Sequence, residues 1–178
     1  LSQALEQMTG ENSRGFGPPD EWVPPAMRLV EQLGDGVRAD VLLWFFSYAF
    51  SEYRVIFGVN GEGGTLGNTG RRYPWAKQLV RIMDDAYADV FPRTWFMLVR
   101  VMGEFCRITA AQLKEILARA AQSDMDVAVM LKELMRTLEF ESDMQARLSS
   151  RMESVKKAMQ GLDESEEEDE SDDDDDAP

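Results

Sequence analysis

Apolar residues along this chain recur every three or four positions, which is the spacing of one helix face. Between 72 and 90 the recurring residues are Trp75, Leu79, Ile82, Met83, Ala86 and Val90. From Val41 to Phe50 almost every position is apolar. A helix of that kind is buried on several sides, either as a central core helix or with one side against another subunit. The pattern predicts an all-α fold, an elongated bundle or rod of about six helices without strands.

Local signals place the ends of the first helices. Asp20 is expected to cap a short helix that carries Pro24 and Pro25 in its first turn, where missing N–H groups cost little. Gly34 and Gly36 should end that helix, and Asp40 should open the next, which runs to about Phe57. The segment Gly58 to Gly70 holds five further glycines inside it or at its end and is expected to be a flexible connector.

Later boundaries follow from proline and capping signals. Pro92 should separate the helix of 72–90 from one with an apolar stripe that includes Trp95, Met102 and Cys106. Thr109 and Gln112 have the spacing of a capping box, which predicts a new helix from 109. Ser123, followed by Asp126, is expected to cap the last helix.

The last helix carries a stripe that steps by four, three and four residues. Its members are Val127, Leu131, Leu134 and Leu138, and the pattern returns at Leu148, Met152, Val155 and Met159. Such a stripe suits the edge of a bundle or an intermolecular coiled coil. Past Phe140 the sequence offers this helix few partners, and we expect it to end near Gln160, before Gly161.

Charge is concentrated at one end of the chain. The net charge is -14, but Asp163 to Asp176 alone holds 12 acidic residues and no basic ones. Removing these from the 33 acidic residues leaves 21 against 19 basic ones. We therefore expect a flexible segment over 1–19, a helical domain over 20–160 and a disordered acidic tail over 161–178. The near-neutral body gives no basic field for nucleic acid. In the tail, Ser165 and Ser171 precede acidic residues and are candidates for phosphorylation.

The residue types exclude several kinds of chemistry. The chain has no histidine and a single cysteine, Cys106. Histidine bases, Ser-His-Asp triads, thiolate metal clusters and an intrachain disulfide are therefore excluded. The glycine-rich loop lacks the lysine of a phosphate-binding loop. We expect no cofactor and no enzymatic activity. An enzyme would need Glu104 and Glu141 to be paired acids in one apolar cleft.

Other polar residues have simpler interpretations. Glu104 should form a surface ion-pair cluster with Arg100 and Arg107. Cys106 should be a buried, inert thiol, with a reactive thiol as the alternative. Arg71, Arg72, Lys77 and Arg81 lie around the start of one helix. They form either a solvated face or a contact for an acidic partner segment or an anionic membrane. The longest uncharged apolar run, Val41 to Ser51, is too short to span a bilayer.

Blocks of residues between 50 and 150 resemble the N-terminal helical region of the family of vacuolar protein sorting-associated protein 53. The most specific blocks are Arg71-Arg72-Tyr73-x-Trp75, Phe91-Pro92-x-x-Trp95 and Glu104-Phe105-Cys106-Arg107-Ile108-Thr109. Glu52 to Phe57 precedes them, and the following helix matches at Leu131, Leu134, Thr137, Phe140, Glu141 and Leu148. Pro74, the glycine-rich loop and the acidic tail depart from the family pattern.

The resemblance implies a scaffold subunit of the Golgi-associated retrograde protein complex and its endosomal recycling counterpart. These multisubunit tethers capture endosome-derived vesicles. Expected partners are the other helical-rod subunits, with SNARE proteins and small GTPases. The expected location is cytoplasmic, peripheral at trans-Golgi network and endosome membranes. Because the chain begins at Leu1, we expect it to be a fragment.

A second hypothesis rests on the tail alone. Long acidic runs attract basic proteins through salt-sensitive electrostatics. The chain could then be an acidic-tailed helical chaperone or adaptor for basic proteins.

Overall fold

The computed structural model describes residues 19–122 and 126–169. Within them the chain forms six α-helices and no strand, as predicted. The helices are α2 (Val23–Gln32), α3 (Asp35–Ala49), α4 (Ser51–Phe57), α5 (Arg72–Asp85), α6 (Met97–Ala120) and α7 (Val127–Asp169). Two short 3-10 helices join them, η1 (Leu66–Arg71) and η2 (Arg93–Trp95).

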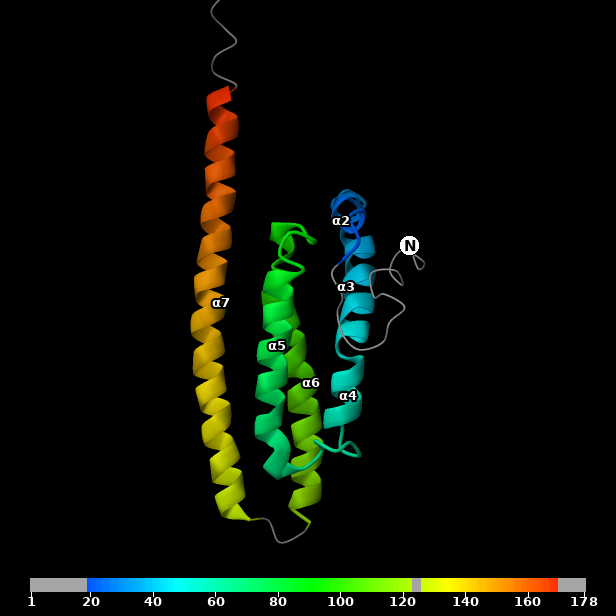
Figure 1. Cartoon of the computed structure of the whole chain (residues 1–178), viewed down its shortest axis with the longest axis vertical. Coiled ribbons are helices and arrows are strands. Elements are labelled where there is room, and N and C mark those ends of the chain that lie inside the picture. The colour runs from blue at the N-terminus through cyan, green and yellow to red at the C-terminus, as the bar shows by residue number, and fades with distance from the viewer. Residues whose placement is uncertain (1–18, 123–125, 170–178) are drawn as a thin grey trace, which may run out of the picture. The chain divides into compact units, whose positions relative to one another are not determined.

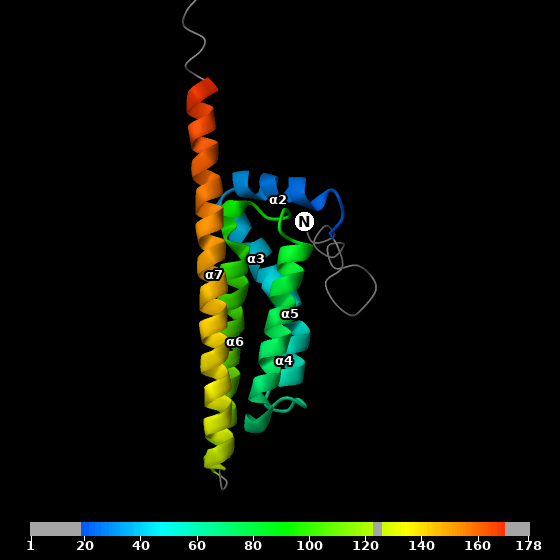
Figure 2. The same cartoon turned by 60° about the vertical axis from the view of Figure 1, so that its left-hand side comes forward.

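The chain divides into two compact units, Leu1–Phe140 and Glu141–Pro178. The division falls at the residue beyond which the sequence offered α7 few partners. In the first unit, α5 and α6 lie side by side and α3 and α4 follow one another along their flank (Figure 1). Figure 2 shows α2 lying across the end of α3. The proposed three-part division of the chain stays a prediction.

The first helices differ from the sequence expectation in where they begin and end. α2 starts at Val23 with prolines in its first turn, as predicted. Gly34 then takes a left-handed φ of 95°, and α3 begins at Asp35 instead of Asp40. The helix expected to reach Phe57 is divided at Phe50, whose φ of -103° interrupts it before α4. Phe50 is fully buried, so the break occurs in the core.

The glycine-rich loop is compact and hydrogen-bonded, whereas the sequence suggested a flexible connector. The Gly63 amide donates to the carbonyl of Ile56 at 2.8 Å, and Gly61 donates to Gly58 at 2.8 Å. A Cβ on Gly61 would lie 2.2 Å from the Val55 carbonyl oxygen. Only glycine allows the loop to approach the end of α4 this closely.

Pro92 lies between two helices, as predicted, whereas the boundary at Thr109 was predicted wrongly. α5 ends at Asp85, before the predicted end at Val90, and a turn leads to η2. α6 runs unbroken from Met97 through Thr109 to Ala120, so Thr109 and Gln112 are interior positions of one helix and form no capping box. Their side chains bond to other helices instead, which a local sequence motif cannot anticipate.

Asp126 caps α7, because its carboxylate accepts the amide of Ala128 at 2.8 Å. Ser123, the other expected cap, lies outside the described residues. α7 passes through Gly161, where we expected it to end, and continues to Asp169. Residues 170–178, including Ser171, also lie outside the described part, and Ser165 falls in the last turns of α7. A disordered tail and phosphorylation of these serines stay predictions.

Candidate interaction surface

Three of the sequence blocks meet around one side chain, Tyr53 on α4. The Tyr53 ring lies 4.6 Å from the Trp75 ring and 5.4 Å from the Phe105 ring, measured between centroids. Its hydroxyl lies 2.6 Å from the Thr109 hydroxyl. Trp75 comes from one block, and Phe105 and Thr109 come from another, so blocks far apart in the sequence form one packed centre, here called the Tyr53 cluster. Sequence reasoning placed Tyr53 in a block without identifying it as this centre.

Arg72 is the charged member of the Tyr53 cluster and is fully buried, with 0% exposure. Its Nη1 donates to the Tyr53 hydroxyl at 3.0 Å and to the Gln112 amide oxygen at 2.6 Å. Its Nη2 donates to the Phe57 carbonyl at 2.8 Å. The guanidinium also lies 5.0 Å from the centroid of the Phe57 ring. The interpretation of Arg72 as part of a solvated basic face was therefore wrong.

The acceptors around Arg72 are a phenol, an amide and a main-chain carbonyl, and none is a carboxylate. A buried cation is costly unless its donors are satisfied and its charge is spread over polarisable groups. Both Nη atoms of Arg72 donate hydrogen bonds, whereas its Nε has no hydrogen-bond partner among the described residues. Burial raises the pKa of the Tyr53 phenol, and its hydrogen bonds to Thr109 and Arg72 oppose that rise. Tyr53 is therefore a neutral phenol that accepts from Arg72 and can donate to Thr109. The arrangement joins α4, α5 and α6 and contains no nucleophile activated by a base.

Phe91 and Trp95 belong to a second apolar cluster. The Phe91 ring lies 5.2 Å from Phe45 of α3 and 5.8 Å from Trp95. Trp95 is fully buried, and neighbouring Pro92 forms the N-terminal boundary of η2. Burial also raises the pKa of Tyr87, whose ring lies 6.0 Å from that of Phe45, to about 12. This block therefore positions α3 against the segment before α6.

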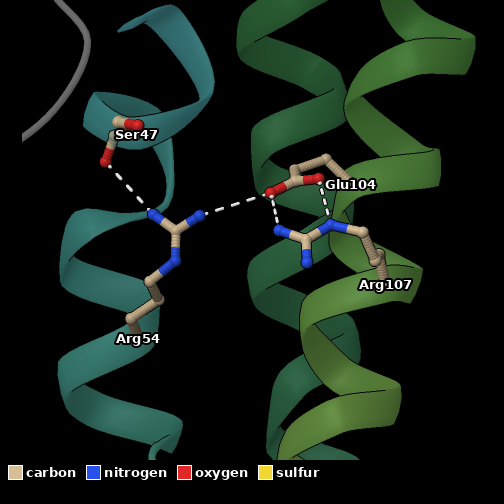
Figure 3. A network of polar contacts seen from close by, with 4 residues as sticks. All are labelled: Ser47, Arg54, Glu104 and Arg107. Carbon is tan, nitrogen blue, oxygen red and sulfur yellow. Dashed lines mark hydrogen bonds and ion pairs between the residues drawn. The ribbon is translucent and has the colours of Figure 1, made fainter. Parts of the chain in front are cut away.

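Glu104 lies between two arginines from two helices (Figure 3). Its carboxylate accepts from Arg107 at 2.6 and 2.7 Å and from Arg54 at 3.3 Å. Arg54 also donates to the Ser47 carbonyl at 3.3 Å. The hydrogen bonds from Arg107, with the charges of both arginines, hold the pKa of Glu104 below its usual range. Such a carboxylate stays ionised, so Glu104 is unsuited to act as a general acid near neutral pH.

Arg100, the other expected partner of Glu104, makes a different hydrogen bond. Arg100 donates through Nε to the Trp95 carbonyl at 2.8 Å instead of pairing with Glu104. The pair with Arg107 was predicted correctly, whereas Arg54 lies 50 residues away and could not be found from helix spacing.

Cys106 is exposed, which contradicts its predicted burial. The inward face of α6 contains Met97, Val101, Phe105 and Ile108, all buried. This face is rotated by about one residue from the predicted stripe. Since neighbouring residues of a helix point about 100° apart, that rotation turns Cys106 outward.

The predicted leucine stripe of α7 faces solvent over its first three turns. Val127, Leu131, Leu134 and Leu138 are between 51% and 58% exposed, and the neighbouring Met135 is 64% exposed. Residues at this spacing lie on one side of a helix, so these five side chains form a continuous apolar strip about 17 Å long. We call this strip, made of the five residues named here, the α7 stripe.

A different face of α7, on its residues up to Phe140, packs against other helices of the first unit. Phe140 stacks on Tyr73 of α5 at 4.5 Å and meets Phe105 of α6 at 5.7 Å. The Tyr73 hydroxyl bonds to that of Thr137. Buried Glu133 accepts the Gly70 amide at 2.6 Å. The leucines are therefore not needed for packing in this unit, and large contiguous apolar patches of this kind are typical of interaction sites.

The described part of the chain lacks two other kinds of feature. Among the described residues, no group of three or more cysteine or acidic side chains is arranged to hold a metal ion. Across the same residues, no helix has the length and apolarity needed to cross a membrane.

Comparison with known proteins identifies a family. The family model "Vps53, N-terminal" matches residues 9–172. "Vacuolar protein sorting-associated protein 53" of Saccharomyces cerevisiae is 30% identical over 120 residues, which are 67% of this chain and 15% of the yeast protein.

Two further relatives indicate the same family. An Arabidopsis thaliana protein, "Vacuolar protein sorting-associated protein 53 A", is 30% identical over 67% of this chain and 14% of its own length. The Caenorhabditis elegans homolog is 30% identical over 65% of this chain and 14% of its own length. The chain thus spans about a seventh of the relatives it matches. No solved structure matched it.

Proposed function

The chain belongs to the Vps53 family of vesicle-tethering complex subunits, and from that premise we propose that it is a non-enzymatic scaffold segment for endosome-to-Golgi retrograde transport. It would work through contacts with other helical-rod subunits of the tether. The whole tether would engage SNARE proteins and small GTPases. It would be located in the cytoplasm, peripheral at trans-Golgi network and endosome membranes.

The observation that carries this proposal is the exposure of the α7 stripe. Its spacing of four, three and four residues is the pattern by which two helices pack along a seam. Positions beside the seam, such as Ala128 and Thr137, are uncharged, so no charge repels a partner helix. The stripe therefore suits an amphipathic helix from another subunit.

The roles of the family-motif residues support a non-enzymatic function. Arg72, Tyr73, Phe105 and Thr109 join helices within the first unit, and Glu104 is held as an ionised carboxylate. Arg71 and Cys106 are exposed. The buried motif residues act in packing, which is what a scaffold requires.

Affinity purification of the full-length protein from its native cells, followed by mass spectrometry, tests the proposal. The wild type should recover the other tether subunits. The double variant Leu131→Glu/Leu134→Glu should lose at least about tenfold of that recovery, because it places charge in the seam.

Leu43→Glu, at a 68% exposed position of α3, is the matched control and should retain the partners. Recovery of mainly basic proteins, lost in moderate salt, would contradict the scaffold proposal and favour the acidic-tail hypothesis.

A further inference from the structure

A second surface of the first unit is an open groove between the start of α5 and the first turns of α7. Its volume is about 780 Å³. One wall presents Arg71, at the end of η1, and then Pro74, Lys77, Gln78 and Arg81 of α5; the wall on α7 presents Arg136 and Glu139. Tyr73 and Phe140 line it where their rings stack at 4.5 Å, which gives the groove a rigid aromatic base.

Positive charge dominates this groove. Four cationic side chains line it, namely Arg71, Lys77, Arg81 and Arg136. Two carboxylates lie near them: Glu139 in the lining and the buried Glu133, which pairs with Arg136 at 2.8 Å. Lys77 has an interaction of its own, and without it the lining still holds three arginines against these two carboxylates. This local excess contrasts with the net charge of -14 for the whole chain.

Arg136 remains available to a ligand despite its pairing. Glu133 accepts the Gly70 amide through Oε2 and Arg136 through Oε1, so both of its oxygens are engaged. Only 4% of the Glu133 side chain is exposed, against 46% of the Arg136 side chain. The carboxylate therefore fixes the guanidinium at the wall of the groove, and a large part of that guanidinium side chain still faces solvent.

The spacing of the cations fits an extended chain. Along α5, Lys77 and Arg81 are four residues apart, a rise of about 6 Å, and Arg71 to Arg81 spans about 15 Å. In an extended peptide, side chains on the same face are about 7 Å apart, and five residues span about 14 Å between the outer two. Acidic side chains at the two ends of such a five-residue segment would therefore come near Arg71 and Arg81.

We propose that this groove binds an acidic, extended peptide segment of a partner protein, with acidic side chains at alternate positions. The recessed aromatic base favours a peptide over a flat anionic surface, because a lipid bilayer cannot enter a groove between two helices. The ion pairs would be partly exposed, so binding should be of modest affinity and strongly weakened by salt.

Fluorescence anisotropy on the full chain tests the proposal with a labelled peptide of alternating glutamate and serine. The same peptide with glutamine in place of glutamate is the uncharged reference. The glutamate peptide should bind at least about tenfold more tightly at low salt, and this preference should fall several-fold as salt increases. Equal binding of the two peptides, or binding of neither, would overturn the proposal.

Variants locate the binding. Arg71→Glu/Arg81→Glu should weaken binding of the glutamate peptide at least about tenfold, because two favourable pairs become repulsive. Lys114→Glu, an exposed position of α6 outside the groove, is the matched control and should change binding less than about twofold. Equal effects of the two charge reversals would mean that binding is non-specific and would overturn the assignment.

Two further arms test other occupants. Vesicles with about a third of anionic phosphatidylserine should bind wild type and the double variant alike; a loss confined to vesicle binding would identify a membrane contact instead. Deleting residues 170–178 should change peptide affinity only slightly. A rise beyond about tenfold would show that the chain's own acidic tail fills the groove, which would overturn the assignment to a partner.

Discussion

Arg72 and Leu131 both reverse the usual preference of their residue type. The arginine is fully buried in the Tyr53 cluster, whereas the leucine is 52% exposed in the α7 stripe. The buried arginine is held by three helix-joining hydrogen bonds and thus makes one arrangement of α4, α5 and α6 favourable. The exposed leucine has no such constraint and leaves an apolar surface for another chain. One region therefore specifies the fold, and the other is available for assembly.

The largest effect should come from breaking the Tyr53 cluster. Arg72→Ala removes the donors to Tyr53, Gln112 and Phe57 and leaves a cavity. Unsatisfied buried acceptors each cost about 1–3 kcal/mol, so the free energy of unfolding should fall by about 3 kcal/mol or more. Urea denaturation followed by circular dichroism measures this loss. Arg28→Ala, at an exposed position of α2, should change stability by no more than about 0.5 kcal/mol.

An unchanged midpoint of urea denaturation for Arg72→Ala would mean that the hydrogen bonds of Arg72 contribute little to stability. The Tyr53 cluster would then owe its arrangement to aromatic packing alone.

An intermediate effect should separate two faces of α7. Phe140→Ala removes a side chain that is only 6% exposed and contacts Tyr73 and Phe105, so it should lower stability by about 3 kcal/mol. Leu138→Ala, two residues earlier and 55% exposed, should cost less than about 1 kcal/mol. Paired thermal and urea denaturation measures both. Similar losses for the two variants would show that the α7 stripe is part of the core after all.

The smallest effect concerns the ion-pair network of Figure 3. Because the folded pKa of Glu104 is lowered, its contribution to stability is present above its ordinary pKa of 4.5. It is lost as the pH falls through the lower folded value. Glu104→Gln should therefore cost about 1 kcal/mol or less near neutral pH. The gap between wild type and variant should narrow as the pH falls from neutrality through 4.5 and below.

Denaturation curves of both proteins across this pH range provide the measurement. A gap that widened on acidification would contradict the assigned direction of the pKa shift.

Sequence patterns predicted the helical class and the blocks that carry the family resemblance, because periodicity and residue order are local properties. They failed where a contact spans many residues. Helix spacing predicted the pair of Glu104 with Arg107, but Arg54 comes from a helix 50 residues earlier. Thr109 and Gln112 have the spacing of a capping box but do not form one, because both side chains hydrogen-bond to residues of other helices.

The sequence by itself determined that this chain is built of helices and that α7 carries a stripe with coiled-coil spacing. It also excluded histidine chemistry, an intrachain disulfide and thiolate metal clusters. Only the tertiary structure decided which faces are inward. It buried Arg72, turned Cys106 and the α7 stripe outward, and placed Arg71, Arg81 and Arg136 around one groove. The physical reason is that periodicity identifies a helix face, whereas the burial of that face depends on the side chains that other helices pack against it.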